Sequence, residues 1–580
     1  MKLTLAKTAG FCMGVRRAVD MVLDASNRTD GPVYTYGPLI HNSQVLDILK
    51  NKNISILNHI PDKGIGTVLI RAHGIPPNEK KQLISSGYSV IDATCPRVIK
   101  VQTIIHKYAQ SGYATLILGD ADHAEVKGLM GYSQGNGHVI QDIDELKEQP
   151  KYPKAIMVAQ TTQNYDLFFK ASEYIEANHA HYLIFNTICD STSKRQAEVK
   201  EIAKDSDAVV VVGGKNSGNT QRLTQVVRQQ GIPAFHIETE EELPVNKFRS
   251  YQRVGITAGA STPNWIINCV CHQLEDLSST QKGFFLKLGQ TIQQNLLLTN
   301  IFVGFGAGCL AFACMCMQGI QPVFQQVMMA FLYVLSMHTL NNYISRKAER
   351  YNFPYRAIFY EKFSIPLLVM AFSAGLSGLF IAFFQGKVAF IVLLTMSILG
   401  MAYKVKIFPP GISLLSNIQK IQDIPGSKTI LIAIAWGVVT SILPSITAHG
   451  YITLSSLSVF IWSMGLVFTR SAFFDLLDIQ GNRIVGQETI PGLLGERKTM
   501  QLLRFLSIIL FLCGPAFYFF GLTHVISVFV STSAIMFFYF LKFNEKKHLL
   551  SGARLHFFVE SQFVVCGIMA WIPWYFIKDI

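Results

Sequence analysis

The most restrictive feature of this 580-residue chain is a long stretch without charge. Between residues 288 and 345 there is no aspartate, glutamate, lysine or arginine. That length is enough for two membrane-spanning helices of about 20 residues each. Upstream, to about residue 281, charges are frequent and glycine turns separate short runs of valine, isoleucine and leucine. The sequence therefore predicts a soluble α/β part followed by a membrane part.

Nine apolar segments can be counted in the membrane part. They cover about residues 294–317, 322–344, 364–385, 388–403, 429–446, 454–474, 503–521, 523–541 and 560–577. Lysines and arginines gather in the loops after the second, fourth, sixth and eighth segments, whereas the opposite loops carry little beyond Lys387. Because this is the positive-inside pattern and no signal peptide is apparent, we expect a multi-pass protein of the cell inner membrane with its N-terminal part in the cytoplasm. The net charge of +13 largely reflects this topology, so nucleic-acid binding is not expected.

The soluble part repeats one unit, which consists of a short β run, a loop and a helical pattern. Strands that alternate with helices predict parallel sheets, whose sites lie at the carboxyl ends of the strands. The Cys12 turn and eight later loops carry unusual polar residues, and cysteine occurs in three of these segments and histidine in three. We therefore expect several modules to face one cavity. The candidate residues are Cys12, His41, His73, Cys95, His123, Glu125, Thr161, Cys189, Ser217, Asn219 and Ser261.

The cysteines indicate what kind of cavity this is. Cys12 lies in a turn between Gly10 and Gly14 at the start of a helical pattern, where the helix dipole and free N–H groups favour a thiolate. For one isolated cysteine, a small buried turn residue is the simpler interpretation. Cys12, Cys95 and Cys189 have no CxxC spacing, so a zinc knuckle is not indicated. Three cysteines from three modules are better explained by an iron–sulfur cluster with one non-cysteine position.

The remaining loop residues suggest an anion site. Loops 213–220 and 257–262 are rich in N–H groups and hydroxyls and are candidate oxyanion or phosphate cradles. The first lacks the Gly-Lys-Ser/Thr ending of a P-loop, so nucleotide binding is weakly supported. The three histidines would add contacts to a diphosphate, although each alone is more simply a surface or turn residue. Glu125 is either a proton donor or a helix N-terminal carboxylate that stabilises the dipole.

In this order, the motifs resemble those of the 4-hydroxy-3-methylbut-2-enyl diphosphate reductase (LytB/IspH) family over essentially all of residues 1–275. The matching stretches are Gly-Phe-Cys12-Met-Gly, Ile-His41-Asn, Ala-His73-Gly, Ala-Thr-Cys95-Pro, His123-Ala-Glu125, Gln-Thr161-Thr, Cys189, Asn-Ser217-Gly-Asn219 and Gly-Ala-Ser261. The resemblance implies three pseudo-equivalent α/β modules, each supplying one cysteine to a central [4Fe–4S] cluster. It implies reductive dehydroxylation of 4-hydroxy-3-methylbut-2-enyl diphosphate to isopentenyl and dimethylallyl diphosphate. Electrons would come from an external donor such as ferredoxin, flavodoxin or a similar carrier.

The same resemblance implies roles for the individual residues. Cys12, Cys95 and Cys189 would be the metal ligands, and the substrate hydroxyl would bind the open iron. Glu125 would deliver the proton, with Thr161 nearby. The substrate, mostly its diphosphate, would be held by the remaining loop residues, which are His41, His73, His123, Ser217, Asn219 and Ser261.

The membrane part has one chemically unusual stretch, residues 470–495. Asp475 and Asp478 lie three residues apart and share a helix face at the end of an apolar segment. Carboxylates at that depth are costly and usually functional, and a pair would hold Mg²⁺ against a diphosphate. With the downstream Gly-Asn-Arg and Thr-Ile-Pro-Gly sequences, the stretch resembles the second aspartate motif of UbiA-type intramembrane prenyltransferases, whose usual count is nine helices.

The first aspartate motif of that family is altered in this chain. Asn342, Ser345 and Glu349 stand where the family's first motif has aspartates, and Asn482 stands where the second motif usually has aspartate, so much of the acidic cluster is gone. The candidate diphosphate and Mg²⁺ residues of the membrane part are therefore Asn342, Glu349, Asp475, Asp478 and Asn482. A prenyl-transferring domain remains one interpretation, and a domain that only binds a polyprenyl diphosphate or anchors the reductase in the lipid is the other.

Together these patterns predict a two-domain membrane enzyme. Residues 1–275 form a pseudo-threefold α/β domain around an iron–sulfur cluster, residues 276–292 a linker, and residues 293–580 an all-α membrane domain of about nine helices. The alternative for the soluble part is a cofactor-free α/β hydrolase or phosphate-binding protein.

Overall fold

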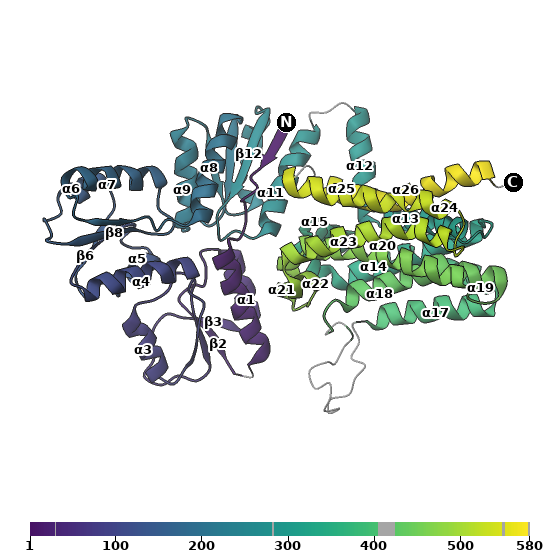
Figure 1. Cartoon of the computed structure of the whole chain (residues 1–580), viewed down its shortest axis with the longest axis horizontal. Coiled ribbons are helices and arrows are strands. Elements are labelled where there is room, and N and C mark those ends of the chain that lie inside the picture. The colour runs from purple at the N-terminus through teal and green to yellow at the C-terminus, as the bar shows by residue number, and fades with distance from the viewer. Residues whose placement is uncertain (30, 281–283, 404–420, 422–423, 548–551, 578–580) are drawn as a thin grey trace. The chain divides into compact units, whose positions relative to one another are not determined.

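A computed structural model describes the chain except residues 30, 281–283, 404–420, 422–423, 548–551 and 578–580. The chain divides into two compact units, Met1–Lys282 and Gly283–Ile580 (Figure 1). The first unit contains all the strands of the described chain, and the regular elements described in the second unit are all helices.

The first unit is built on three four-stranded sheets in which every pairing is parallel. Their strands are β1 (Lys2–Leu5), β2 (Val33–Tyr36), β3 (Ile54–Leu57), β4 (Thr67–Ile70), β5 (Ser89–Asp92), β6 (Ala114–Leu118), β7 (Gly137–Ile140), β8 (Ala155–Ala159), β9 (Leu183–Phe185), β10 (Ala208–Val212), β11 (Ala234–Ile237) and β12 (Arg253–Ala258). Strands β4, β6, β8 and β10 are buried along their whole length. Such continuous apolar strands are typical of parallel sheets that are covered on both faces.

The three sheets share one internal order. Counted from the strand that precedes each cysteine, the orders are β1-β12-β10-β11, β5-β4-β2-β3 and β9-β8-β6-β7. The N-terminal strand β1 thus completes the module that begins with β10, by pairing Lys2 with Arg253 through to Leu5 with Ile256. This arrangement confirms the predicted three-module α/β architecture.

Helices connect the strands and cover the sheets of the first unit (Figure 1). They are α1 (Met13–Arg28), α2 (Ser43–Asn51), α3 (Pro77–Ser85), α4 (Pro96–Gln110), α5 (Ala124–Met130), α6 (Ile143–Lys147), α7 (Tyr165–Asn178), α8 (Asp190–Lys204), α9 (Gly218–Gln229), the 3₁₀ turn η1 (Glu240–Glu242), α10 (Val245–Phe248) and α11 (Asn264–Thr280). The three candidate cysteines are the N-cap residues of α1, α4 and α8. The sequence thus places each thiol at the same point of each module.

The second unit is a helical bundle. Its elements are α12 (Phe284–Leu298), α13 (Ile301–Met317), α14 (Phe324–Asn352), α15 (Pro354–Lys362), α16 (Ser364–Gln385), α17 (Lys387–Ala402), α18 (Ser427–Gly437), the π-helical turn η3 (Val438–Ile442), α19 (Leu443–His449), α20 (Leu454–Leu477), α21 (Ile479–Val485), α22 (Ile490–Leu494), α23 (Glu496–Phe519), α24 (Ile526–Val530), α25 (Thr532–Lys547) and α26 (Gly552–Ile577). Its core packs large side chains, including Trp436, Trp462 and Phe563.

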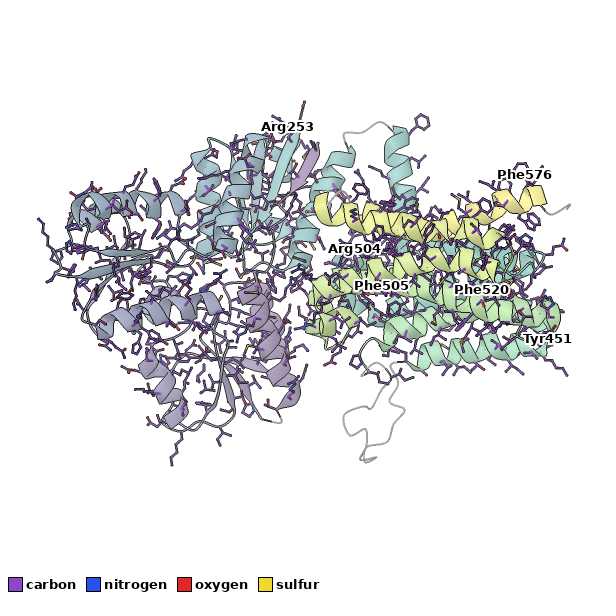
Figure 2. All side chains as sticks on the ribbon, viewed as in Figure 1. Arg253, Tyr451, Arg504, Phe505, Phe520 and Phe576 are labelled. Carbon is purple, nitrogen blue, oxygen red and sulfur yellow. The ribbon has the colours of Figure 1, made fainter. Side chains whose placement is uncertain are left out.

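This unit is a multi-pass membrane domain. Within the described residues, six helices are long and apolar enough to span a bilayer, and a seventh span exists if Leu288–Leu298 and Ile301–Met317, bent by 73°, count as one. Exposed aromatic side chains such as Phe520 (72%) and Phe576 (71%) project from the bundle surface, where lipid would surround them (Figure 2). Each of the nine predicted segments falls on helical chain. The number of membrane crossings, nine, stays a prediction.

Close packing between α14 and α21 depends on a glycine. A Cβ atom at Gly481 would lie 1.6 Å from Asn352 Oδ1. In the native chain, the Asn352 amide Nδ2 donates a hydrogen bond of 3.0 Å to Asn482 Oδ1. The absence of a side chain at residue 481 therefore allows the two altered aspartate motifs to approach each other.

Gly481→Ala tests this contact. The added methyl group displaces the Asn352 amide and breaks its hydrogen bond to Asn482. We therefore expect the free energy of unfolding to fall by roughly 1–3 kcal/mol and the midpoint of thermal unfolding in detergent to be lower. Gly492→Ala is the matched control, because a Cβ there meets only Thr489 Oγ1 at 3.4 Å. Equal midpoints for the two variants would contradict the packing argument.

Candidate active site

All eleven candidate residues of the first unit line one cavity. Three of its walls are the cysteine turns that precede α1, α4 and α8. The other walls are the loops that follow strands β2, β4, β6, β8, β10 and β12, which are the first and third strands of each module in chain order. These loops carry the histidines, the serines and Thr161. The carboxyl ends of the parallel strands thus gather polar side chains that lie far apart in the sequence.

Each cysteine turn is held to its own sheet in the same way. The backbone N–H of each cysteine donates to a carbonyl in the loop after the neighbouring strand. The three bonds are Cys12 to Ala260 (3.1 Å), Cys95 to Ala72 (2.9 Å) and Cys189 to Thr161 (2.9 Å). The turns are therefore equivalent in hydrogen bonding as well as in sequence order.

The thiols come close because one neighbour lacks a side chain. A Cβ at Gly14 would lie 2.6 Å from Cys95 Sγ and 4.0 Å from Cys12 Sγ. Cys95 also interacts electrostatically with both Cys12 and Cys189. Burial raises the pKa of the Cys95 thiol, although the backbone N–H groups of α4 oppose this rise. Three converging thiols, with no fourth cysteine among the described lining residues, fit a [4Fe–4S] cluster that keeps one iron open.

Three histidines form a compact group in the same cavity. The ring centroids of His41, His73 and His123 lie 5.1–5.8 Å apart, and one nitrogen from each lies within 4.8 Å of the others. Burial lowers the pKa of all three, that of His123 to about 4, and the positive charge of Arg71 lowers them further. His41 Nε2 and His73 Nδ1 are buried without a hydrogen-bond partner within the described chain. These atoms are free to meet a ligand.

Two serines and an asparagine extend the cavity wall beside the histidines. Ser261 Oγ lies 3.3 Å from Ser217 Oγ and from the His41 carbonyl oxygen. Ser217 is the N-cap residue of α9, and Asn219 follows in the first turn of that helix. The Asn219 amide Nδ2 is buried without a partner in the described part of the chain. Together with the histidines, these groups offer hydrogen-bond donors to an anion at a helix N-terminus.

Glu125 is the carboxyl group of this cavity. Its side chain is 1% exposed, and it accepts hydrogen bonds from the Thr161 N–H at 2.7 Å and from the Thr161 hydroxyl at 2.8 Å. Burial raises the pKa of Glu125 to about 7, because it penalises the charged form more than the two Thr161 bonds stabilise it. Glu125 therefore holds a proton that can be donated near neutral pH.

Two arginines that act on this cavity are not among the residues predicted from the sequence. Arg71 interacts with the histidine group, as its effect on the three pKa values shows. Arg195 is 4% exposed and interacts electrostatically with Cys12 and Cys189. Arg71 directly precedes the Ala-His73-Gly stretch, so its position next to a predicted site residue could have indicated a role at the site. Nothing in the sequence around Arg195 on α8 indicates such a role.

In the membrane unit, the carboxylates of the two altered motifs converge. Asp478, at the start of α21, interacts electrostatically with Glu349 on α14 and with Asp475 on α20. Asp475 is buried and accepts a hydrogen bond from the Thr429 hydroxyl. Carboxylate oxygens are ligands that Mg²⁺ prefers, so the donor set fits this ion chemically.

Cations also lie within this group. Lys428 interacts with all three carboxylates, and Arg356 Nη1 lies 3.7 Å from Glu349 Oε2. The two predicted amides lie at the margin. Asn342 Nδ2 donates to Asn300 Oδ1 at 3.3 Å, and Asn482 accepts from Asn352. The polar cluster thus contains two cationic side chains among three carboxyl groups.

Known protein families match the two units of this chain separately. Residues 3–275 match the LytB protein family, and residues 300–561 match the UbiA prenyltransferase family. A 4-hydroxy-3-methylbut-2-enyl diphosphate reductase of Geobacter sulfurreducens is 39% identical over 283 residues, which cover 49% of this chain and 100% of the relative. The corresponding reductase of Solidesulfovibrio magneticus is 43% identical and covers 47% of this chain and 99% of its own length.

Solved structures resemble each half separately. A structure of (E)-4-hydroxy-3-methyl-but-2-enyl diphosphate reductase is 40% identical, with a TM-score of 0.39, and covers 48% of this chain and 100% of that one. A UbiA homolog from Archaeoglobus fulgidus bound to GPP and Mg²⁺ is 15% identical, with a TM-score of 0.35, and covers 48% of this chain and 99% of its own. The chain belongs to the 4-hydroxy-3-methylbut-2-enyl diphosphate reductase family, with its LytB domain fused to a UbiA prenyltransferase-family membrane domain.

Proposed function

We propose that the first unit reduces 4-hydroxy-3-methylbut-2-enyl diphosphate to isopentenyl and dimethylallyl diphosphate. The observation that carries this proposal is the shared cavity, in which three cysteines, a buried protonated carboxyl group and an anion cradle meet. The reaction breaks the allylic C–O bond, consumes two electrons and two protons, and releases water. A [4Fe–4S] cluster on Cys12, Cys95 and Cys189 would supply the electrons, which an external carrier such as ferredoxin or flavodoxin would deliver.

The histidine group and its neighbours hold the diphosphate. His41, His73 and His123 are mostly neutral at pH 7 in the free cavity, because burial and Arg71 lower their pKa values. A diphosphate carries several negative charges, which would raise these pKa values and let the rings donate charge-assisted hydrogen bonds. Ser217, Asn219 and Ser261 add neutral donors beside the histidines. The histidine group thus gains its positive charge only when the anion binds.

Glu125 supplies one of the two protons that the reaction consumes. Its hydrogen bonds to the Thr161 backbone and hydroxyl fix the carboxyl group in the cavity wall. Thr161 also accepts the Cys189 N–H through its carbonyl oxygen. Thr161 therefore positions the proton donor and a cysteine turn relative to each other.

Glu125→Gln tests the acid role. The amide keeps the shape but has no acidic proton, so we expect turnover to fall by about 10²- to 10⁴-fold. In the wild type, turnover should decline as pH rises above about 7, since Glu125 loses its proton there. Glu201→Gln, a change at an exposed carboxylate of α8, should alter neither rate nor pH profile. Unchanged turnover in Glu125→Gln would exclude Glu125 as the donor.

We further propose that the membrane unit binds a polyprenyl diphosphate at the polar cluster of Glu349, Asp475 and Asp478. The UbiA-family match supports a prenyl-related function, and Lys428 and Arg356 supply positive charge for the anion. In this proposal the reductase lies on the cytoplasmic side of the inner membrane, and residues 276–292 link the two domains. The fusion would raise the concentration of five-carbon products near the membrane site.

The alternative is an anchor or binding module without transfer activity. It is favoured by the same two cations, which already neutralise much of the carboxylate cluster that would otherwise hold Mg²⁺. The two proposals differ in what they require of Asp475.

The variant Asp475→Ala distinguishes the transferase proposal from the anchor proposal. If the domain transfers prenyl groups, the variant loses transfer in membranes while its reductase activity is unchanged, because the buried carboxylate of the cluster is gone. Glu361→Ala removes an exposed carboxylate of the same unit, one that pairs with Arg350, and serves as the control. Prenyl transfer that is indifferent to Asp475 would end the transferase proposal.

A further inference from the structure

Each cysteine-bearing helix sends one arginine to the cysteine turn of another module. Arg17 of α1 donates from Nη1 to the Thr94 carbonyl at 3.0 Å, directly before Cys95. Arg97 of α4 forms an ion pair with Asp190, directly after Cys189. The three contacts, of which the third is made by α8, run around the cavity in one direction.

Arg195 of α8 makes the third contact. Its Nη2 donates to the Gly10 carbonyl at 2.7 Å, two residues before Cys12, and its Nη1 donates to the Ala258 carbonyl at 3.0 Å. One guanidinium thereby joins the helix that starts at Cys189 to the first cysteine turn and to strand β12. The planar fork of arginine suits this double contact, which a lysine ammonium cannot reproduce.

A glutamate one helical turn along α8 supports the same junction. Glu198 accepts from the backbone N–H groups of Lys7 and Thr8 at 2.7 and 2.9 Å, and from the Thr8 hydroxyl at 2.6 Å. The segment that leads into Cys12 is therefore tied to α8 by both Arg195 and Glu198.

Arg97 and Arg195 differ strongly in burial. The Arg97 side chain is 45% exposed and its partner Asp190 is 65% exposed, so their ion pair contributes little. Arg195 is 4% exposed, and its charge interacts with Cys12 and Cys189. In a water-poor environment this charge acts more strongly on its neighbours than an exposed one does.

We propose that Arg17, Arg97 and Arg195 form a cyclic clamp that positions the three cysteine turns, and that the charge of Arg195 raises the reduction potential of a cluster held there. The inference rests on the proposed function, because it requires a cluster on the three cysteines. Reduction adds negative charge to the cluster, and a buried cation beside two ligands stabilises the reduced form. Arg195 is a positioning residue, since its hydrogen bonds go to the protein backbone.

Two substitutions of Arg195 separate charge from geometry. Arg195→Gln removes the charge and the fork, and Arg195→Lys keeps the charge but loses the fork. Lys204→Gln is the control, because it removes an exposed cation of α8 that pairs with Glu201 and takes no part in the clamp. The full-length protein is purified anaerobically, and two quantities are measured: the midpoint potential by EPR-monitored redox titration and the rate of iron loss to a chelator.

We expect Arg195→Gln to lower the midpoint potential and to lose iron about tenfold faster, as the loss of two buried hydrogen bonds implies. Arg195→Lys should keep a potential near that of the wild type but lose iron faster. Lys204→Gln should match the wild type in both quantities. An unchanged potential in Arg195→Gln, or equal shifts in the Gln and Lys variants, would overturn the charge effect.

If Arg195→Gln does not fold, Arg195→Lys still tests the clamp. The clamp would be overturned if Arg195→Lys lost iron as slowly as the wild type. Wild-type protein that binds no iron would count against the proposed function itself. Iron-loaded protein whose potential and iron loss are unaffected by both Arg195 variants would count against the clamp alone.

Discussion

The active site depends on one repeated interaction, the hydrogen bond from the backbone N–H of each cysteine to the loop after the neighbouring strand. Because all strands of the three sheets are parallel, this bond brings a thiol and an anion-binding loop to the same edge of each sheet. Repetition in three modules then places three thiols, three histidines and a buried carboxyl group around one space. The chemistry follows from this convergence, since no single loop contains more than one cysteine.

Much of this arrangement could be predicted from the sequence because the functional residues follow short β runs. The alternation of strand, loop and helix indicated parallel sheets, and the loop residues indicated one cavity, which the structure contains. The protonation states could not be predicted in the same way. A helix N-terminus favours a thiolate, yet burial dominates at Cys95 and raises its pKa. Arg195 was missed because a helix-face arginine is usually solvated, and only the tertiary fold shows that it points into the core.

The membrane unit gathers side chains of both charge signs at the end of a span. Asp475 and Asp478 keep their places at the end of a span, but Lys428 and Arg356 lie among the carboxylates. Buried charges persist only when they are compensated, and here cationic side chains provide part of the compensation that a metal ion would otherwise give. Gly481 allows α14 and α21 to approach each other closely beside this cluster. The sequence revealed the altered motif, whereas the compensating cations became clear only from the packing.

The most direct test of the central claim is the iron content of the full-length protein after anaerobic purification. A cavity that holds a [4Fe–4S] cluster on three cysteines predicts brown protein with about four iron atoms per chain. Replacing Cys12, Cys95 or Cys189 by serine should abolish the colour, whereas replacing Cys271, which does not line the cavity, should leave it intact. Colourless, iron-free protein with full reductase activity would contradict the account.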